Sequence, residues 1–168
     1  SGQFSETVWG STYSANEAFA KPADGGLATY SGRYAGILNG GPTVPGPGTP
    51  FDPGRPMRTE GDVQINADFT NFAVEGGVRN RRIVETGVAL DDLFLQITTI
   101  NPDGTFGGTV VYTSLSPAGT YGGTFAGDGA TAVAGAVEVR PIEGNGDVLE
   151  RGVFVGDLCA PGDPSPCP

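Results

Sequence analysis

The clearest pattern in the chain is an alternation of apolar and polar residues over 59–69. Apolar side chains occupy every second position and polar side chains lie between them (Val63, Ile65, Ala67 and Phe69 against Asp62, Gln64, Asn66 and Asp68). A period of two is typical of a β-strand with one buried and one solvated face. The alternation resumes over 72–78 after Thr70-Asn71, so the two segments predict a β-hairpin with a two-residue turn.

The rest of the chain predicts further strands of the same kind, at 27–38, 93–100, 105–113, 119–126, 131–140 and 149–157. Turn residues separate them, most clearly at Asn101-Pro102-Asp103-Gly104, where Pro pre-sets φ and Gly tolerates a positive φ. Because hairpin-length connections join the strands, the sheet should be antiparallel. A meander of eight strands can close on itself and remove both edges. We therefore predict an all-β fold, a single eight-stranded antiparallel up-and-down β-barrel.

Three segments follow from this pattern. Residues 1–26 form an irregular N-terminal segment, residues 27–157 form the β-barrel domain, and residues 158–168 form the C-terminal tail. Within the barrel domain, residues 40–56 contain six prolines and predict a long loop. Residues 80–92 predict a polar connection outside the sheet. Because binding residues concentrate on loops of a rigid scaffold, these two segments are the first candidates for a binding surface.

One short internal repeat occurs, Gly104-Thr-Phe-Gly-Gly-Thr109 and Gly119-Thr-Tyr-Gly-Gly-Thr124. An aromatic side chain can cover a glycine on the neighbouring strand, and glycine lets a strand bend as a small barrel requires. The repeat therefore predicts a structural role, with a glycine-lined binding surface as the alternative. We expect a filled interior, with Phe69, Phe72, Phe106 and Tyr121 pointing inward, or else the residues that alternate with them, because the sequence does not fix which face is inside.

Composition narrows the functional classes. The chain has 29 Gly, 14 Pro, no His and a formal net charge of −10. Without His, the Ser-His-Asp and Cys-His catalytic systems and His metal sites are excluded, so we expect a non-enzyme without a cofactor. An acidic surface repels nucleic acid and anionic membranes. No run of 18 apolar residues predicts a membrane-spanning helix, so we expect no direct membrane insertion.

The two cysteines, Cys159 and Cys167, lie in the C-terminal tail. The intervening segment is short and rich in Gly and Pro, and can bring the two Cα atoms within disulfide distance. We predict a disulfide that closes the tail, and with it an oxidising compartment. A metal site with two thiolate ligands is the alternative, although the chain offers no further Cys or His ligand.

Calcium is the metal that the turns could bind. Several turn residues offer the hard oxygen ligands that Ca²⁺ prefers. Asp and Asn also favour turns for backbone reasons, so the same residues have a purely structural interpretation. The candidates are Asn101, Asp103, Asp128, Asn145 and Asp147.

Two groups of residues are candidates for a protein-binding surface. Arg79, Arg81 and Arg82 form a local basic cluster that could recognise carboxylates of an acidic partner. The alternative is a solvated hairpin end whose arginines pair with nearby acids. In the N-terminal segment, aromatic residues could dock onto a neighbouring protein, because aromatics dominate interface hot spots. These aromatic residues are Trp9, Tyr13 and Phe19.

The spacing of glycines and aromatics resembles a known family. The segments that carry the resemblance are 29–36, 62–69, 119–127, 132–137 and 152–156, which include Gly119-Thr-Tyr-Gly-Gly-Thr-Phe-Ala-Gly127 and Gly152-Val-Phe-Val-Gly156. They are similar to the strands of the transferrin-binding-protein-B-like β-barrel domain, over roughly residues 27–157. The resemblance implies an eight-stranded barrel with a packed interior on the outside of Gram-negative bacteria. Members are often surface lipoproteins or solute-binding-like proteins, and some capture host iron or haem carriers.

Together these observations predict a non-enzymatic extracellular or cell-surface binding module. It would recognise a protein or a small ligand through its loops, with a protein as the expected partner. The alternative is a structural or accessory subunit of an extracellular or outer-membrane assembly. We expect the protein at the outer-membrane surface or outside the cell, and the periplasm stays open.

Overall fold

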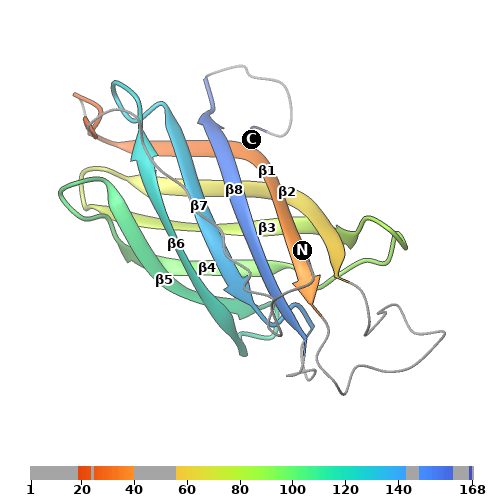
Figure 1. Ribbon diagram of the computed structural model, residues 1–168. Helices are drawn as coiled ribbons and strands as arrows, with labels where there is room; N and C mark the ends of the chain where they lie inside the picture. The colour runs from red at the N-terminus through yellow and green to blue at the C-terminus, as the bar shows by residue number, and fades with distance from the viewer. Residues whose placement is uncertain (1–18, 24, 40–55, 143–147, 161–166, 168) are drawn as a thin grey trace, which may run out of the picture.

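A computed structural model describes residues 19–23, 25–39, 56–142, 148–160 and 167 of the 168-residue chain. These residues contain eight β-strands and no helix (Figure 1). The strands are β1 (Leu27–Asn39), β2 (Met57–Asp68), β3 (Ala73–Ile83), β4 (Leu93–Thr99), β5 (Thr105–Tyr112), β6 (Pro117–Ala126), β7 (Ala132–Val139) and β8 (Leu149–Leu158). In the part of the chain described, no helix could cross a membrane.

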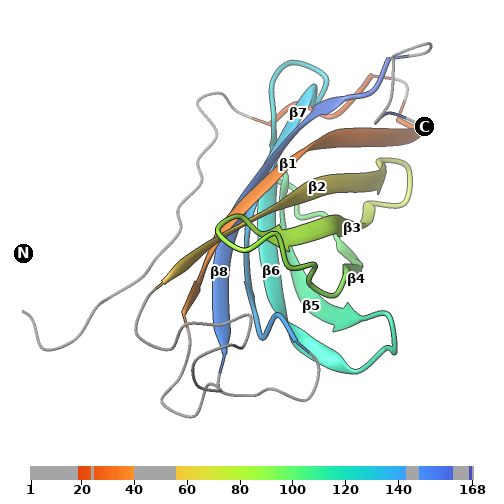
Figure 2. The same ribbon diagram turned by 90° about the vertical axis from the view of Figure 1, so that its right-hand side faces the viewer.

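The strands form one closed antiparallel barrel in chain order. Each strand pairs with the next, and β8 returns to pair with β1, from Tyr30 opposite Leu158 to Asn39 opposite Leu149. Figure 2 shows β8, β1, β2 and β3 succeeding one another around the wall. The predicted fold class, a single up-and-down barrel of eight strands, is therefore confirmed.

The hairpin between β2 and β3 differs from its prediction. The turn covers residues 69–72 instead of Thr70-Asn71 alone. Asp68 holds it, because its carboxylate accepts hydrogen bonds from the backbone N–H groups of Thr70 (2.9 Å) and Asn71 (3.0 Å). Phe72 lies in this turn with φ 54° and 37% of its surface exposed, so its predicted inward position is wrong.

The internal repeat has the structural role that the sequence predicted. Its two copies lie on β5 and β6 and pair with each other, so that Phe106 stands opposite Gly123 and Tyr121 opposite Gly108. A Cβ atom added at Gly123 would overlap the Phe106 ring, and one added at Gly108 would lie 2.8 Å from Tyr121 Cε1. Each aromatic ring therefore covers the second glycine of the other copy.

The buried apolar residues form two clusters. The larger one fills most of the barrel and contains Phe69, Phe106, Phe125 and Phe154. The smaller one lies near one end of the barrel and consists of Leu38, Met57, Ile83, Leu90 and Val148. Phe69, Phe106 and Tyr121 are at most 5% exposed, in agreement with their predicted inward positions.

The predicted disulfide between Cys159 and Cys167 is present, with a Cα–Cα distance of 5.6 Å. Cys159 directly follows β8, and its backbone N–H donates to the Thr29 carbonyl oxygen at 2.8 Å. The start of the closed loop is therefore tied to β1. The oxidising compartment that the disulfide suggested stays a prediction.

Candidate functional site

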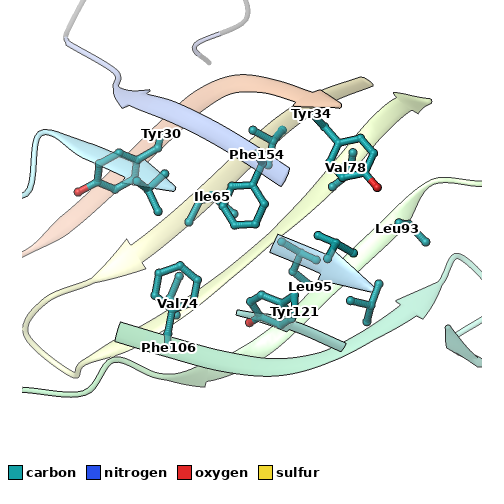
Figure 3. Packing of buried hydrophobic residues seen from close by; sticks show 14 of the residues in the cluster. Tyr30, Tyr34, Ile65, Val74, Val78, Leu93, Leu95, Phe106, Tyr121 and Phe154 are labelled. Carbon is teal, nitrogen blue, oxygen red and sulfur yellow. The ribbon is translucent and has the colours of Figure 1, made fainter. Parts of the chain in front are cut away.

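Aromatic side chains pack against one another inside the barrel. Phe125 lies among them, with its ring centroid 5.1 Å from those of Phe69 and Phe106 and 5.3 Å from that of Tyr30. The Tyr30 hydroxyl donates to the Ala130 carbonyl oxygen at 2.6 Å. Burial raises the pKa of Tyr30, which keeps this hydroxyl protonated. Figure 3 shows labelled members of the cluster converging from opposite strands into one packed centre.

Phe19 closes the end of this aromatic cluster. Its ring centroid lies 6.2 Å from that of Phe69 and 6.4 Å from that of Phe125. A Cβ atom at Gly104 would lie 2.5 Å from Phe19 Cγ, so only a glycine leaves room for this ring. Phe19, predicted as an anchor for a neighbouring protein, packs on its own barrel instead.

A buried ion pair separates the two apolar clusters. Arg81 Nη2 lies 2.5 Å from Glu150 Oε2, and both side chains are fully buried. The other Glu150 oxygen accepts hydrogen bonds from the hydroxyls of Tyr34 (2.7 Å) and Thr59 (2.5 Å). Arg81 also donates to the Asp91 carbonyl oxygen. Burial and, next, the Glu150 charge raise the pKa of Tyr34, so this hydroxyl remains a donor.

A β-bulge in β3 turns Arg81 inward. Between the pairs Glu60–Arg82 and Asp62–Arg79, the single residue Gly61 of β2 stands opposite Asn80 and Arg81. Asn80 adopts φ 52°, the left-handed region that Asn tolerates better than most residues. Because the bulge adds one residue, Asn80 remains exposed while Arg81 is buried.

The same bulge gathers charged groups on the outer face of β1, β2 and β3. Arg33 Nη1 lies 2.6 Å from Asp62 Oδ1, and Arg82 Nη2 lies 2.5 Å from Glu60 Oε1. Asn80 Nδ2 donates to the other Asp62 oxygen at 2.9 Å. We call the set Arg33, Glu60, Asp62, Arg79, Asn80 and Arg82 the Arg surface. All of these residues except Arg79 line a shallow depression of about 530 Å³.

Arg79 is an exposed arginine of β3. No Asp or Glu in the described ranges forms a salt bridge with it. It lines a second depression of about 330 Å³, together with Glu75, Gln96 and Phe94. Its guanidinium therefore remains available to a partner's carboxylate.

The three arginines of the basic cluster predicted from the sequence do not lie on the same side of the barrel wall. Arg79 and Arg82 lie on the outer face, as a binding surface requires. Arg81 is 1% exposed, so its predicted place on that surface is wrong, because the bulge points it inward. The prediction that 80–92 is a connection outside the sheet is also wrong for its first residues, since β3 continues to Ile83.

Sequence reasoning missed Arg33, which stands beside Val155 and Asp62 on neighbouring strands. Its place on the polar face of the predicted strand 27–38 was the one signal that could have found it. Trp9, Tyr13 and the loop 40–55 lie outside the described residues, so these predicted binding elements are not placed.

The turn carboxylates have local structural partners. Asp103 accepts hydrogen bonds from the Thr105 N–H (3.0 Å) and hydroxyl (2.6 Å), which lower the pKa of this carboxyl. Asn101 Nδ2 donates to the Thr105 hydroxyl at 3.0 Å. Within the described ranges, no three acidic or Cys side chains cluster as metal ligands. Asn145 and Asp147 lie outside those ranges, and Asp128 lies in the β6–β7 turn.

Comparison with known proteins shows the fold. No family model matches the chain, and no curated protein does either. Among similar solved structures is a double mutant of the vaccine antigen transferrin binding protein B (TbpB) from Haemophilus parasuis, with TM-score 0.52 and 17% identity over 84% of this chain and 28% of that one. A single mutant of the same antigen gives TM-score 0.50 and 17% identity over 86% and 29%.

This chain therefore spans less than a third of the length of those TbpB chains. It has the fold of a TbpB-like β-barrel domain, as the glycine and aromatic motifs predicted. At this identity the likeness concerns the fold alone.

Proposed function

We propose that this chain is a non-enzymatic binding module at the cell surface or outside the cell, and that it recognises a protein partner through the Arg surface. The observation that carries the proposal is the filled interior. Large aromatic and aliphatic side chains occupy the inward positions, and Arg81 and Glu150 fill the layer between the two clusters. Recognition by the described part of the chain then belongs to its outer face or to the turns that join the strands.

The charge distribution favours the Arg surface over the rest of that outer face. The chain carries 19 acidic and nine basic residues. Arg33, Arg79 and Arg82 nevertheless share one stretch of wall, on β1 and β3. Arg is enriched at protein interfaces because its planar guanidinium pairs with carboxylates in a defined geometry. β-Bulges are also common beside functional sites, where they re-aim side chains.

The shared fold adds support for binding at the cell surface. The proteins with the similar structures are named for binding transferrin. A binding function on the same scaffold needs only a different outer surface, because function lies in sites grafted on folds. The alternative, a subunit of a larger assembly, loses one of its three aromatic anchors, since Phe19 packs inside its own chain.

Charge reversal tests the proposal. The variant Arg79→Glu/Arg82→Glu and a matched control, Lys21→Glu/Arg140→Glu, change the net charge equally, and the control residues lie outside the strands. Each is used with the wild type to capture partners from the native cell envelope in mild detergent. We expect the wild type and the control to recover the same protein, and the Arg79/Arg82 variant to lose at least about tenfold in recovery.

Two results would contradict the proposal. Equal recovery by the Arg79/Arg82 variant would place the binding site elsewhere. Recovery of no protein by the correctly folded wild type would contradict a protein partner altogether. Circular dichroism of each variant checks that the barrel is intact.

A further inference from the structure

A row of five side chains crosses the outer wall next to the Arg surface. In the register of the sheet, Glu138 on β7 stands opposite Arg151 on β8, which stands opposite Ile37 on β1, and Ile37 stands opposite Arg58 on β2. Arg151 Nε binds Glu138 at 2.6 Å, and Arg58 Nε binds Glu85, just beyond β3, at 2.9 Å. The order is acid, Arg, Ile, Arg, acid, symmetric about β1.

An apolar trough lies at the centre of this row. Its floor and walls are Ala35, Gly36, Ile37, Val84, Gly152 and Val153, and its volume is about 500 Å³. Arg58 and Arg151 flank it. Val84, in the turn that follows β3, is 37% exposed and adds its side chain to the apolar lining. Ala35 and Glu60 belong to both the trough and the Arg-surface depression, so the two are continuous.

The partner acids of the two arginines lie on the outer sides of the row. Glu138 is on the strand beyond β8, and Glu85 follows the strand beyond β2. Both guanidiniums therefore stand between an acid of this chain and the apolar centre. A ligand that enters the trough meets an arginine on two sides, Glu60 at the edge shared with the Arg surface, and an aliphatic floor. This is the arrangement of an interface core with a charged rim.

We propose that the trough binds an acidic segment of a protein partner, in which one aliphatic side chain fills the centre and a carboxylate on either side pairs with Arg58 and Arg151. This inference rests on the proposed function, because it names the chemistry of the partner that the neighbouring Arg surface contacts. β2 and β8 flank β1, so the two arginines are about 10 Å apart at the backbone. An extended segment Glu-x-Leu-x-Glu spans about 13 Å between its carboxylate-bearing residues, within reach of two long side chains.

A peptide titration tests the chemistry without the natural partner. The ¹⁵N-labelled full chain is titrated with a capped Glu-Gly-Leu-Gly-Glu peptide, and backbone amide shifts are followed by NMR. We expect saturable shifts with a dissociation constant of about 1 mM, confined to residues 35–37, 58–60 and 151–153. The same peptide with Gln for both Glu residues, or with Gly for Leu, should bind at least about tenfold more weakly.

The matched variants are Arg58→Gln/Arg151→Gln and Arg33→Gln/Arg82→Gln. The first should lose the response and the second should keep it, while both retain a dispersed spectrum. The inference is overturned if the Gln peptide binds as well as the Glu peptide, if the shifts fall outside the trough, or if no saturable shift occurs. None of those outcomes changes the result expected when Arg79 and Arg82 are tested by capture of a partner. The peptide titration can therefore overturn this inference without overturning the proposed function.

Discussion

Arg81 carries a positive charge into the interior of the barrel, between two apolar clusters. Its Nη groups donate to Glu150 and to the Asp91 carbonyl, but its Nε has no hydrogen-bond partner. Burying two charges is costly, and their attraction offsets that cost only when the remaining polar atoms are satisfied. Tyr34 and Thr59 donate to the second Glu150 oxygen, so nearly every polar atom of the network has a partner. The exception is Arg81 Nε, whose burial without a hydrogen bond lowers stability.

A single and a double substitution measure this balance. Arg81→Met leaves the Glu150 charge buried and unpaired, and we expect it to lower the free energy of unfolding by about 3–5 kcal/mol. Arg81→Met/Glu150→Gln removes both charges and keeps an acceptor for Tyr34, so it should regain most of that loss. Urea unfolding followed by fluorescence gives both values. A double variant as unstable as the single one would show that the pair contributes through packing and not through charge.

At the scale of the strand, the bulge in β3 decides which arginine is buried. Asn80 holds the extra residue with a positive φ and a side-chain hydrogen bond to Asp62. Gly61 leaves room opposite it, since a Cβ atom there would lie 2.9 Å from the Arg79 carbonyl oxygen and 3.0 Å from Arg81 Cγ. The Arg surface and the buried ion pair thus depend on one local backbone feature.

Substitution at Asn80 tests that dependence. Asn80→Ala places an ordinary residue in the left-handed region and removes the Asp62 contact, so it should cost about 1–2 kcal/mol of stability. Asn80→Gly removes the same contact but tolerates the conformation, so it should be the more stable of the two. Chemical denaturation of both variants makes the comparison. Equal stability of the two variants would mean that the positive φ is not what limits the bulge.

The sequence allowed most strands to be predicted because each has one buried face. The alternation in β2 and the paired repeat on β5 and β6 depend on neighbours close in sequence. Arg81 could not be assigned in this way. Its partner Glu150 is 69 residues away, and the bulge shifts the alternation between Val78 and Ile83. The polar residues that begin the segment 80–92 therefore predicted a connection, although closure of the barrel gives Arg81 a buried partner.

Prediction of the candidate site was limited for a related reason. Arg79 and Arg82 were found because they are close together in the sequence. Arg33 joins them only because β1 and β3 both pair with β2. The trough depends in addition on the closure between β1 and β8, which brings Val153 and Arg151 beside Ala35 and Ile37. Sites assembled by long-range pairing leave little trace in a single sequence.

For the molecule as a whole, the pairing of β8 with β1 closes the sheet, so we expect the eight strands to unfold as one cooperative unit. The disulfide lies outside this closed sheet. The last strand ends at Leu158, and the bond joins Cys159 to Cys167, eight residues on. By the chain-entropy model, a disulfide that closes such a short loop raises the free energy of unfolding by roughly 2–3 kcal/mol, provided that the loop folds together with the barrel. Because all eight ladders lie before the loop, we expect Cys159→Ser/Cys167→Ser to lower the free energy of unfolding by less than about 1 kcal/mol. Urea unfolding of the oxidised wild type and the variant measures the difference, and a loss of the full 2–3 kcal/mol would show that the tail folds as part of the barrel.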